Sequence, residues 1–214
     1  LGTDQTVIGR FNHPLGDATA LIVGNGTSKT ATSNAFTFDF DVNATALGSF
    51  ISNGADYAEM FEWKDGNPTE EDRSGMMVTL EGTKIRKATA ADNYILGATS
   101  STPAVVANAQ GLSWQGKYVK DKFGRTLYEQ TDGVKHPKLN PDYDSTLAYV
   151  PRNKRKEWVP VGIVGQLVVR DNGTCEADGY CKPGNDGIAI KSDTITKYRV
   201  MERIDENTVR IFIN

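Results

Sequence analysis

"MMVTLEGTKIRKA", residues 76–88, decides the fold class of this 214-residue chain. Apolar and polar residues alternate on both sides of Glu81 and Gly82, with the period of a strand that buries one face. A glycine between two such runs is typical of the tight turn that joins antiparallel strands. The stretch therefore predicts a β-hairpin that turns at Glu81 and Gly82.

Strand patterns recur on both sides of this hairpin. A potential N-cap at Asn67, followed by Pro68 and two acids, predicts one short helix from residue 67. A long irregular stretch runs from about residue 111 to 158, and loops of that length usually have a function or cover a partner. We expect a mainly β, predominantly antiparallel domain with few short helices. Its further strands are predicted at residues 94–101, 159–170, 187–192, 197–204 and 207–214, with a tight turn at 205–207.

Residues 1–53 have a different composition from the rest of the chain. They hold six charged residues, whereas all three tryptophans and all eight tyrosines come later. Short apolar runs at 5–11, 19–25 and 34–42 predict strands, each too small to bury a core alone. Such pieces usually stack on, or wrap around, identical chains, as in trimeric fibre stalks. A small β-meander packed on the following domain is the alternative. We therefore predict two parts, residues 1–53 and 54–214.

Charge and hydropathy exclude several classes of protein. The net charge is −3 and the isoelectric point is about 5.5, so nothing indicates a nucleic-acid or anionic-lipid partner. Mean hydropathy is −0.44, and no apolar run approaches the roughly 18 residues of a membrane helix. The first residues, LGTDQTVIGR, lack both an initial Met and the pattern of a signal peptide. We expect a soluble fragment of a longer protein.

The cysteines and histidines do not form a recognisable metal or catalytic motif. Cys175 and Cys181 lie in a turn-rich segment, far along the chain from His13 and His136. A structural zinc site needs four ligands, so we expect no metal and no cofactor. Neither histidine has a nucleophile motif around it, which argues against a serine-histidine-acid triad. Two reduced, packed thiols are the leading interpretation, and a small disulfide loop is the alternative.

Two further motifs have both a structural and a functional interpretation. Gly162 and Gly165 lack the spacing of a nucleotide-binding loop and are predicted as packing or bulge positions in a strand. A basic run is predicted as a solvated face, with an anion or nucleotide-phosphate contact, or pairing with acids of a neighbouring subunit, as alternatives. The run consists of Arg152, Lys154, Arg155 and Lys156. Three aromatic residues are predicted as core or trimer interface, with a glycan site as the alternative: Trp114, Tyr118 and Trp158.

The boundary between the two parts, SFISNGADYAEMFEW at residues 49–63, carries the reactive chemistry. Asn53 is positioned to attack its own carbonyl, since Gly54 leaves the backbone unhindered. Ser52 is a second potential nucleophile. A carboxylate, Asp56 or Glu59, is the third route, as general base for a water molecule. On a helix these two acids share a face, and on a strand they point to opposite faces. A plain linker is the alternative to all three routes.

Several ordered blocks of sequence resemble one known family. They are GADYAEMFEWKDGNPTEEDRSGMMVTLEGTKIRKA (54–88), DNYILGATSSTPAVV (92–106), WQGKYVKDKFGR (114–125), LNPDYD (139–144), EWVPVGIVGQLVVRDNGTCEADGYCKP (157–183) and KYRVMERI (197–204). Together they resemble the C-terminal self-cleaving intramolecular chaperone domain of bacteriophage tail spikes and pre-neck appendage proteins, classed as a glutamic-type peptidase. The segments VIGRFN, ALIVGNGTS and SNAFTFDFD look like the end of a trimeric phage stalk.

The resemblance implies an intramolecular chaperone that trimerises, sets three spike chains in register and then cuts itself off at its own N-terminal edge. It places the scissile bond at Ser52–Asn53, with Asn53–Gly54 next. The glutamic classification favours Glu59 as general base, with Asp56 assisting. The implied function is therefore that of a single-turnover, cis-acting endopeptidase.

The implied partners are two further copies of the chain and the upstream stalk of the same chain, without nucleic acid or membrane. A host-surface glycan is an open partner of the full-length spike. The implied location is the virion tail, after assembly in the bacterial host cytoplasm. The alternative function is a non-cleaving structural fibre tip, or a receptor- or glycan-binding module of the same fold.

Overall fold

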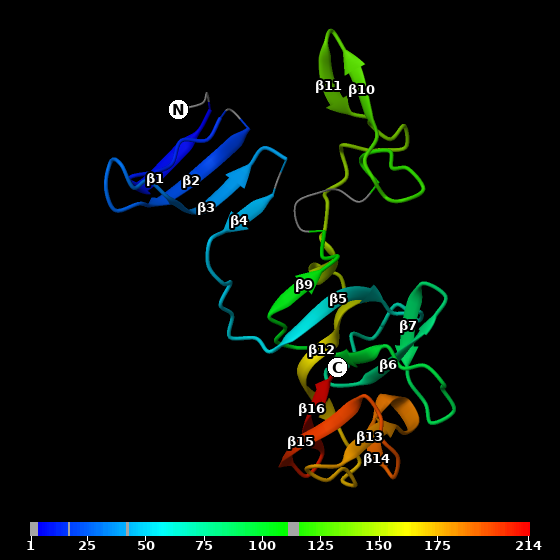
Figure 1. Ribbon diagram of the computed structural model, residues 1–214. Helices are drawn as coiled ribbons and strands as arrows, with labels where there is room; N and C mark the ends of the chain where they lie inside the picture. The colour runs from blue at the N-terminus through cyan, green and yellow to red at the C-terminus, as the bar shows by residue number, and fades with distance from the viewer. Residues whose placement is uncertain (1–3, 17, 42, 111–115) are drawn as a thin grey trace. The chain divides into compact units, whose positions relative to one another are not determined.

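The computed structural model describes residues 4–16, 18–41, 43–110 and 116–214 (Figure 1). The chain divides into two compact units, Leu1–Ser52 and Asn53–Asn214. This division concerns compactness alone. The roles assigned to residues 1–53 and 54–214, a stalk end and a chaperone, stay predictions.

Unit 1 is a four-stranded sheet with little core of its own. Its strands lie in the order β1-β2-β3-β4, with β1 parallel to β2 and the other pairs antiparallel. Three of them confirm predicted strands, and β4 was not predicted. Ile22 is fully buried, whereas Leu47, Phe50 and Ile51 are strongly exposed. The bounds are β1 Thr6–Arg10, β2 Thr19–Asn25, β3 Asn34–Asp39 and β4 Ala44–Ala46.

Unit 2 is built on a ten-stranded sheet, which confirms the predicted mainly antiparallel β class. Most of its strands follow one path, β14-β13-β15-β16-β12-β8-β6-β7, and β5 pairs with both β12 and β9. Only the β5–β9 pair of this sheet is parallel among the strands described. The bounds are β5 Asp56–Glu62, β6 Met77–Glu81, β7 Lys84–Lys87, β8 Gly97–Thr99, β9 Val105–Ala107, β12 Trp158–Arg170, β13 Tyr180–Pro183, β14 Ala189–Ser192, β15 Tyr198–Asp205 and β16 Thr208–Ile213.

Strand β12 organises this sheet because it pairs with three neighbours. Its first half pairs with β5 and β8, and its second half pairs with β16. The register with β5 shifts between Gly162 and Val164, and Gly165 has a φ of +109°. Any side chain at Gly165 would overlap the backbone of Ala55. The interpretation of Gly162 and Gly165 as packing and bulge positions is therefore confirmed.

The opening hairpin forms, with its turn at Gly82 and Thr83, one residue later than predicted. Strands β6 and β7 pair Leu80 with Ile85 and Glu81 with Lys84, and Gly82 has a φ of +66° in the turn. A positive φ is costly for residues with a Cβ, which explains the glycine at this position. The predicted turn before β16 also forms, at the end of β15.

The short helix predicted from residue 67 is wrong, because the segment is an irregular turn. Asn67 has a φ of +44°, and its side-chain amide bonds both the N–H and the carbonyl of Glu71. The Arg73 guanidinium draws the segment inward, since it lies 4.6 Å from the Trp63 ring centroid and bonds Asp65 twice. These tertiary contacts outweigh the weak helical signal of Asn67 and Pro68.

Arg73→Ala should lower the free energy of unfolding by about 2 kcal/mol, because Arg73 is buried although Asp65 is half-exposed. Urea unfolding followed by tryptophan fluorescence measures this. The hydrogen bonds from Arg73 lower the pKa of Asp65 to about 2. A depressed carboxyl pKa gives stability that is present above its unfolded value of about 4 and lost as the pH falls toward 2.

The difference in the free energy of unfolding between Arg73→Ala and the parent chain should therefore become smaller below pH 4. Arg125→Ala is the matched control, since Arg125 pairs with Asp121 while 75% exposed, and it should leave the free energy of unfolding close to that of the parent chain. Two results would contradict this prediction. One is an equal loss of stability in the two variants, and the other is a stability difference between Arg73→Ala and the parent chain that stays constant down to pH 2.

The long irregular stretch contains a small hairpin that was not predicted. Strands β10 (Tyr128–Thr131) and β11 (Val134–Pro137) form a separate two-stranded sheet. Asp132 and Gly133 both have positive φ, as a type I′ turn requires. The Asp-Gly pair was the available sequence signal. The 3₁₀ helices η1 (Arg152–Lys154) and η2 (Asn185–Gly187) are the short helices of the described residues.

The main core of unit 2 lies along β12, β15 and β16, with Leu167, Val200 and Ile211 among its members. Cys175 and Cys181 belong to it as free thiols, which confirms the interpretation of reduced, packed cysteines. Hydrogen bonding between the two thiols, together with burial, raises the pKa of Cys175. Among the described residues no helix has the length and apolarity to cross a membrane.

Candidate active site

The chain is firmly held just after the predicted cleavage point. The Ala104 N–H donates to the Asp56 carbonyl at 2.8 Å, and the Gln166 N–H donates to the Ala55 carbonyl at 3.2 Å. Gly54 lies so close to the backbone of Ala104 that a side chain there would overlap it. Residues 54–56 are therefore fixed between the segment that leads into β9 and the centre of β12.

Asp56 is the most unusual polar residue of this region. It opens β5 opposite Gly165 and is only 5% exposed. Its Oδ1 accepts a hydrogen bond from the Ser100 hydroxyl at 2.9 Å. Its Oδ2 is buried without a hydrogen-bond partner in the part of the chain that the structure describes. A buried oxygen of this kind is costly in a native protein and often marks a functional site.

The environment of Asp56 opposes its ionisation. Burial raises the pKa of this carboxyl, and the hydrogen bond from Ser100 acts in the opposite direction. Gly162 lies directly beside the unpartnered oxygen, since a Cβ there would be 2.7 Å from Oδ2 and closer still to the Leu167 side chain. Only glycine at position 162 leaves room for the carboxyl group.

A pocket of about 330 Å³ joins Asp56 to the predicted cleavage point. Asn53, the residue after the predicted scissile bond, lines it together with Asp56 and Ser100. Gln166 and Arg210 also line it, and both carry N–H donors. Arg210 pairs with Glu202 at 2.6 Å. The pocket thus brings a buried carboxyl group and polar donors to the N-terminal edge of unit 2.

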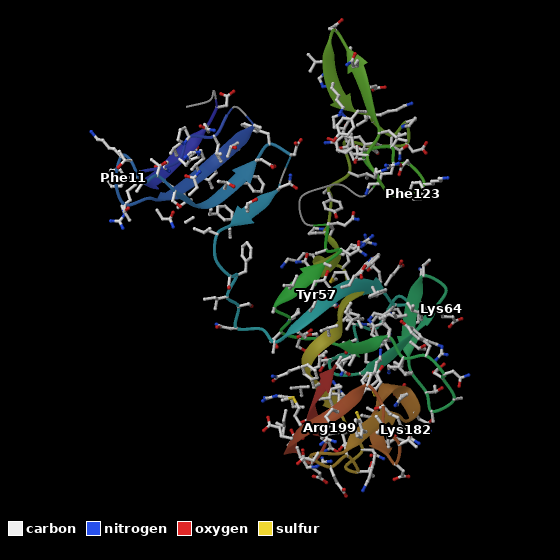
Figure 2. The ribbon with its side chains drawn as sticks, viewed as in Figure 1. Phe11, Tyr57, Lys64, Phe123, Lys182 and Arg199 are labelled. Carbon is white, nitrogen blue, oxygen red and sulfur yellow. The ribbon has the colours of Figure 1, made fainter. Side chains whose placement is uncertain are left out.

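Glu59 does not line this pocket. The segment is a strand, so Asp56 and Glu59 point to opposite faces. Tyr57, labelled in Figure 2, shares the face of Glu59, whereas Ala58 and Met60 are buried on the face of Asp56. The structure therefore does not bring the two predicted acids together. The assignment of Glu59 as the general base stays a prediction.

The basic run is not a uniformly solvated face, so that expectation is wrong for Arg152. Arg152 is 6% exposed, its guanidinium stacks 3.9 Å from the Trp158 ring centroid, and its Nη1 donates to the Asn108 carbonyl. Stacking on indole and bonding to a carbonyl make this burial tolerable. Arg155 pairs with Glu157, and Lys156 lies 3.9 Å from Glu70. Lys154, Arg155 and Lys156 line the neighbouring pocket together with Glu70 and Glu157, so most of its positive charge is already paired.

The glycan site proposed as an alternative gains no support. Trp158 is covered by Arg152 and Arg155, and Trp114 lies outside the described residues. Tyr118 forms an isolated bridge with Leu139. No cluster of three or more His, Cys, Asp or Glu side chains with metal-binding geometry occurs within the described ranges.

Sequence reasoning missed Ser100, Gln166 and Arg210 as members of the pocket. Ser100 lies 44 residues after Asp56, and Arg210 lies on β16 near the end of the chain. No local spacing connects such residues. The one available signal was the cluster GATSST at the end of the strand predicted at 94–101, since small polar residues at a strand end often build sites.

A buried acid, a pocket and a fixed backbone lie together at one chain boundary, and comparison with known proteins gives the class of protein. The chain belongs to the family described as Peptidase_G2, IMC autoproteolytic cleavage domain, whose model matches residues 15–209. The match begins within unit 1 and continues across residues 52 and 53 into unit 2.

Similar curated proteins are much longer than this chain. The pre-neck appendage protein of Bacillus phage B103 is 42% identical over 145 residues, which are 65% of this chain and 16% of that protein. The pre-neck appendage protein of Bacillus phage phi29 is 39% identical over 144 residues, which are again 65% of this chain and 16% of that protein. The putative phage-related protein YobO of Bacillus subtilis is 38% identical over 168 residues, or 75% of this chain and 20% of that protein.

Two solved structures share the fold. The pre-mature bacteriophage phi29 gene product 12 matches with a TM-score of 0.79 and 28% identity, over 93% of this chain and 26% of that one. The C-terminal fragment of the same gene product matches with a TM-score of 0.63 and 33% identity, over 74% of this chain and all of that fragment.

Proposed function

We propose that this chain is part of a phage appendage or tail-spike protein, in which residues 54–214 act as an intramolecular chaperone. Three copies associate, the chaperone sets the preceding stalk in register, and the chain then cuts itself between Ser52 and Asn53. The observation that carries the proposal is the pocket that Asn53 and the buried Asp56 line together. The proposed location is the virion tail, after assembly in the host cytoplasm.

The proposed chemistry is hydrolysis in cis. The Asp56 carboxylate takes a proton from a water molecule as the water oxygen bonds to the Ser52 carbonyl carbon. The bond from that carbon to the Asn53 nitrogen then breaks, the nitrogen takes the proton, and a Ser52 carboxylate and an Asn53 amine remain. Gln166 and Arg210 are the proposed donors to the oxyanion, since they line the same pocket.

Asp56 replaces Glu59 as the proposed general base for a geometric reason. Asp56 lines the same pocket as Asn53, whereas Glu59 points to the other face of β5. A group held in place on the same chain reaches effective molarities of about 10⁵ M or more, so no histidine is needed. The carboxylate type of peptidase is part of this proposal.

The exposed apolar residues of unit 1 support the proposed trimer. Leu47, Phe50 and Ile51 are 72%, 77% and 95% exposed, which is unfavourable unless another surface covers them. Short strands specify their register weakly, and long-range pairing is slow. A folded unit that holds three chain ends together lowers the entropic cost of starting such a stalk. Cleavage afterwards makes assembly of the stalk irreversible, which gives kinetic stability.

The test is refolding of the full 214-residue chain, purified unfolded in urea and diluted into buffer. Denaturing gels over time should show two fragments, and mass spectrometry should place the new ends at Ser52 and Asn53. Sedimentation should show a trimer before cleavage. A folded chain that stays intact would contradict self-cleavage and favour the alternative, a non-cleaving fibre tip or receptor-binding module.

A further inference from the structure

Ser100 is the one side chain that bonds the Asp56 carboxyl group in the described part of the chain. Its hydroxyl donates to Asp56 Oδ1 at 2.9 Å, and both residues are buried, at 9% and 5% exposure. With Oδ1 occupied in this way, Oδ2 is the oxygen without a partner. The two carboxyl oxygens are therefore distinct: Oδ1 is bonded to Ser100, and Oδ2 is packed beside Gly162.

Ser100 occupies a rigid position. It follows β8 directly, and its N–H donates to the Pro160 carbonyl of β12 at 2.9 Å. The preceding residue, Thr99, is 1% exposed and exchanges hydrogen bonds with Met76. Asp56 is held to the same strand β12 through Gly165. One strand thus fixes both partners, which keeps the hydroxyl and the carboxyl group in register.

We infer that Ser100 is a positioning residue of the cleavage reaction, whose hydroxyl holds the Asp56 carboxylate through Oδ1 in the orientation and charge state that the general base needs. This role rests on the proposed function of Asp56. Ser100 does not itself act on the scissile bond in this scheme. Its hydroxyl selects the rotamer of Asp56 and favours the charged form, because a donor stabilises a carboxylate more than a carboxylic acid.

The surroundings make this hydrogen bond the main polar influence on Asp56. Of the side chains that line the pocket with Asp56, Arg210 of β16 is the charged one, and it is paired with Glu202 of β15. Strand β12 presents Gln166, Leu167 and Val168, and the segment after β8 presents Ser101 and Thr102. Strand β9, which pairs with β5, contributes Val105, Val106 and Ala107.

The test measures the rate of self-cleavage of the refolded full chain between pH 4 and 9. Loss of the hydroxyl in Ser100→Ala should move the midpoint of the rising limb to higher pH by about one pH unit. Below the midpoint the rate should fall about tenfold, whereas the plateau at high pH should stay within about threefold. Ser100→Thr keeps the hydroxyl and should restore the wild-type midpoint.

Ser192→Ala is the matched control, because Ser192 is also buried but bonds the Thr194 carbonyl and does not line the pocket, so the midpoint should not move. If Asp56→Asn stays uncut, the proposed function holds. In that case an unchanged midpoint in Ser100→Ala, or an equal loss of rate at every pH, would overturn the inference about Ser100. Normal cleavage by Asp56→Asn, or an intact wild-type chain, would overturn the proposed function instead. Circular dichroism of each variant separates these results from a failure to fold.

Discussion

Asp56→Asn should remain intact under conditions in which the wild-type chain cuts itself. The substitution preserves shape, and its amide oxygen still accepts the hydrogen bond from Ser100, but an amide cannot accept a proton from water. Loss of a general base slows a reaction by about 10² to 10⁴-fold. The rate constant of fragment formation after refolding, followed on denaturing gels, measures the loss.

Glu59→Gln is the matched comparison, since it removes the second acid of the same strand. It should slow cleavage by less than about tenfold, because Glu59 does not line the pocket with Asn53. The reverse order, with Glu59→Gln inactive and Asp56→Asn active, would return the role of base to Glu59. Loss of activity in both variants would mean that both carboxyl groups take part.

The same Asp56→Asn change should stabilise the fold. Burial raises the pKa of Asp56, so the ionised carboxylate is less favourable in the folded chain than in the unfolded chain. The stability associated with the protonated form is present below the unfolded value of about 4 and is lost as the pH rises through the folded value. The free energy of unfolding of Asp56→Asn should therefore exceed that of the wild type most at neutral pH and little at pH 4.

Gly162→Ala should disrupt both the core and the reaction. A Cβ at this position would lie 2.7 Å from Asp56 Oδ2 and would overlap the buried Leu167 side chain. Overpacking of this kind costs about 1–3 kcal/mol, and a base moved out of place costs at least about tenfold in rate. Urea unfolding of uncut chains that also carry Asp56→Asn measures the first effect, and refolding kinetics measure the second.

Gly48→Ala is the control for Gly162→Ala, because nothing lies within 4 Å of a Cβ at that position. It should leave both stability and cleavage close to wild type. A Gly162→Ala chain that is as stable as this control and cuts at the wild-type rate would show that Asp56 does not depend on the space beside Gly162.

Much of the fold could be predicted from local pattern. The hairpin of residues 76–88 was predicted because alternation and Gly82 agree, and β16 because NTVRIFIN follows a clear turn. The local sequence of β5 does not decide between a helix and a strand, since Asp56 and Glu59 would share one face of a helix and take opposite faces of a strand. Pairing with β12 decides between them, and that partner lies about a hundred residues further along the chain.

The site was harder to predict because its contacts are long-range. The sequence indicated Asn53 and Asp56, which are close in the chain, but not Ser100, which the pairing of β8 with β12 brings to Asp56. The predicted helix after Asn67 was wrong for a different reason, since local bonds from Arg73 to Asp65 fix an irregular turn. The burial of Arg152 also depends on Trp158 and Asn108, which come from different segments.

The most direct test of the central claim is the mass of the two fragments formed when the full chain refolds in water enriched in heavy oxygen. Hydrolysis by a water molecule predicts one heavy oxygen atom in the new Ser52 carboxylate and an unlabelled fragment that begins at Asn53. A fragment that begins at Ser52 would indicate attack by the serine hydroxyl, and an upstream piece that ends in modified Asn53 would indicate a succinimide. Either of these results, or a folded chain that stays whole, would contradict the account.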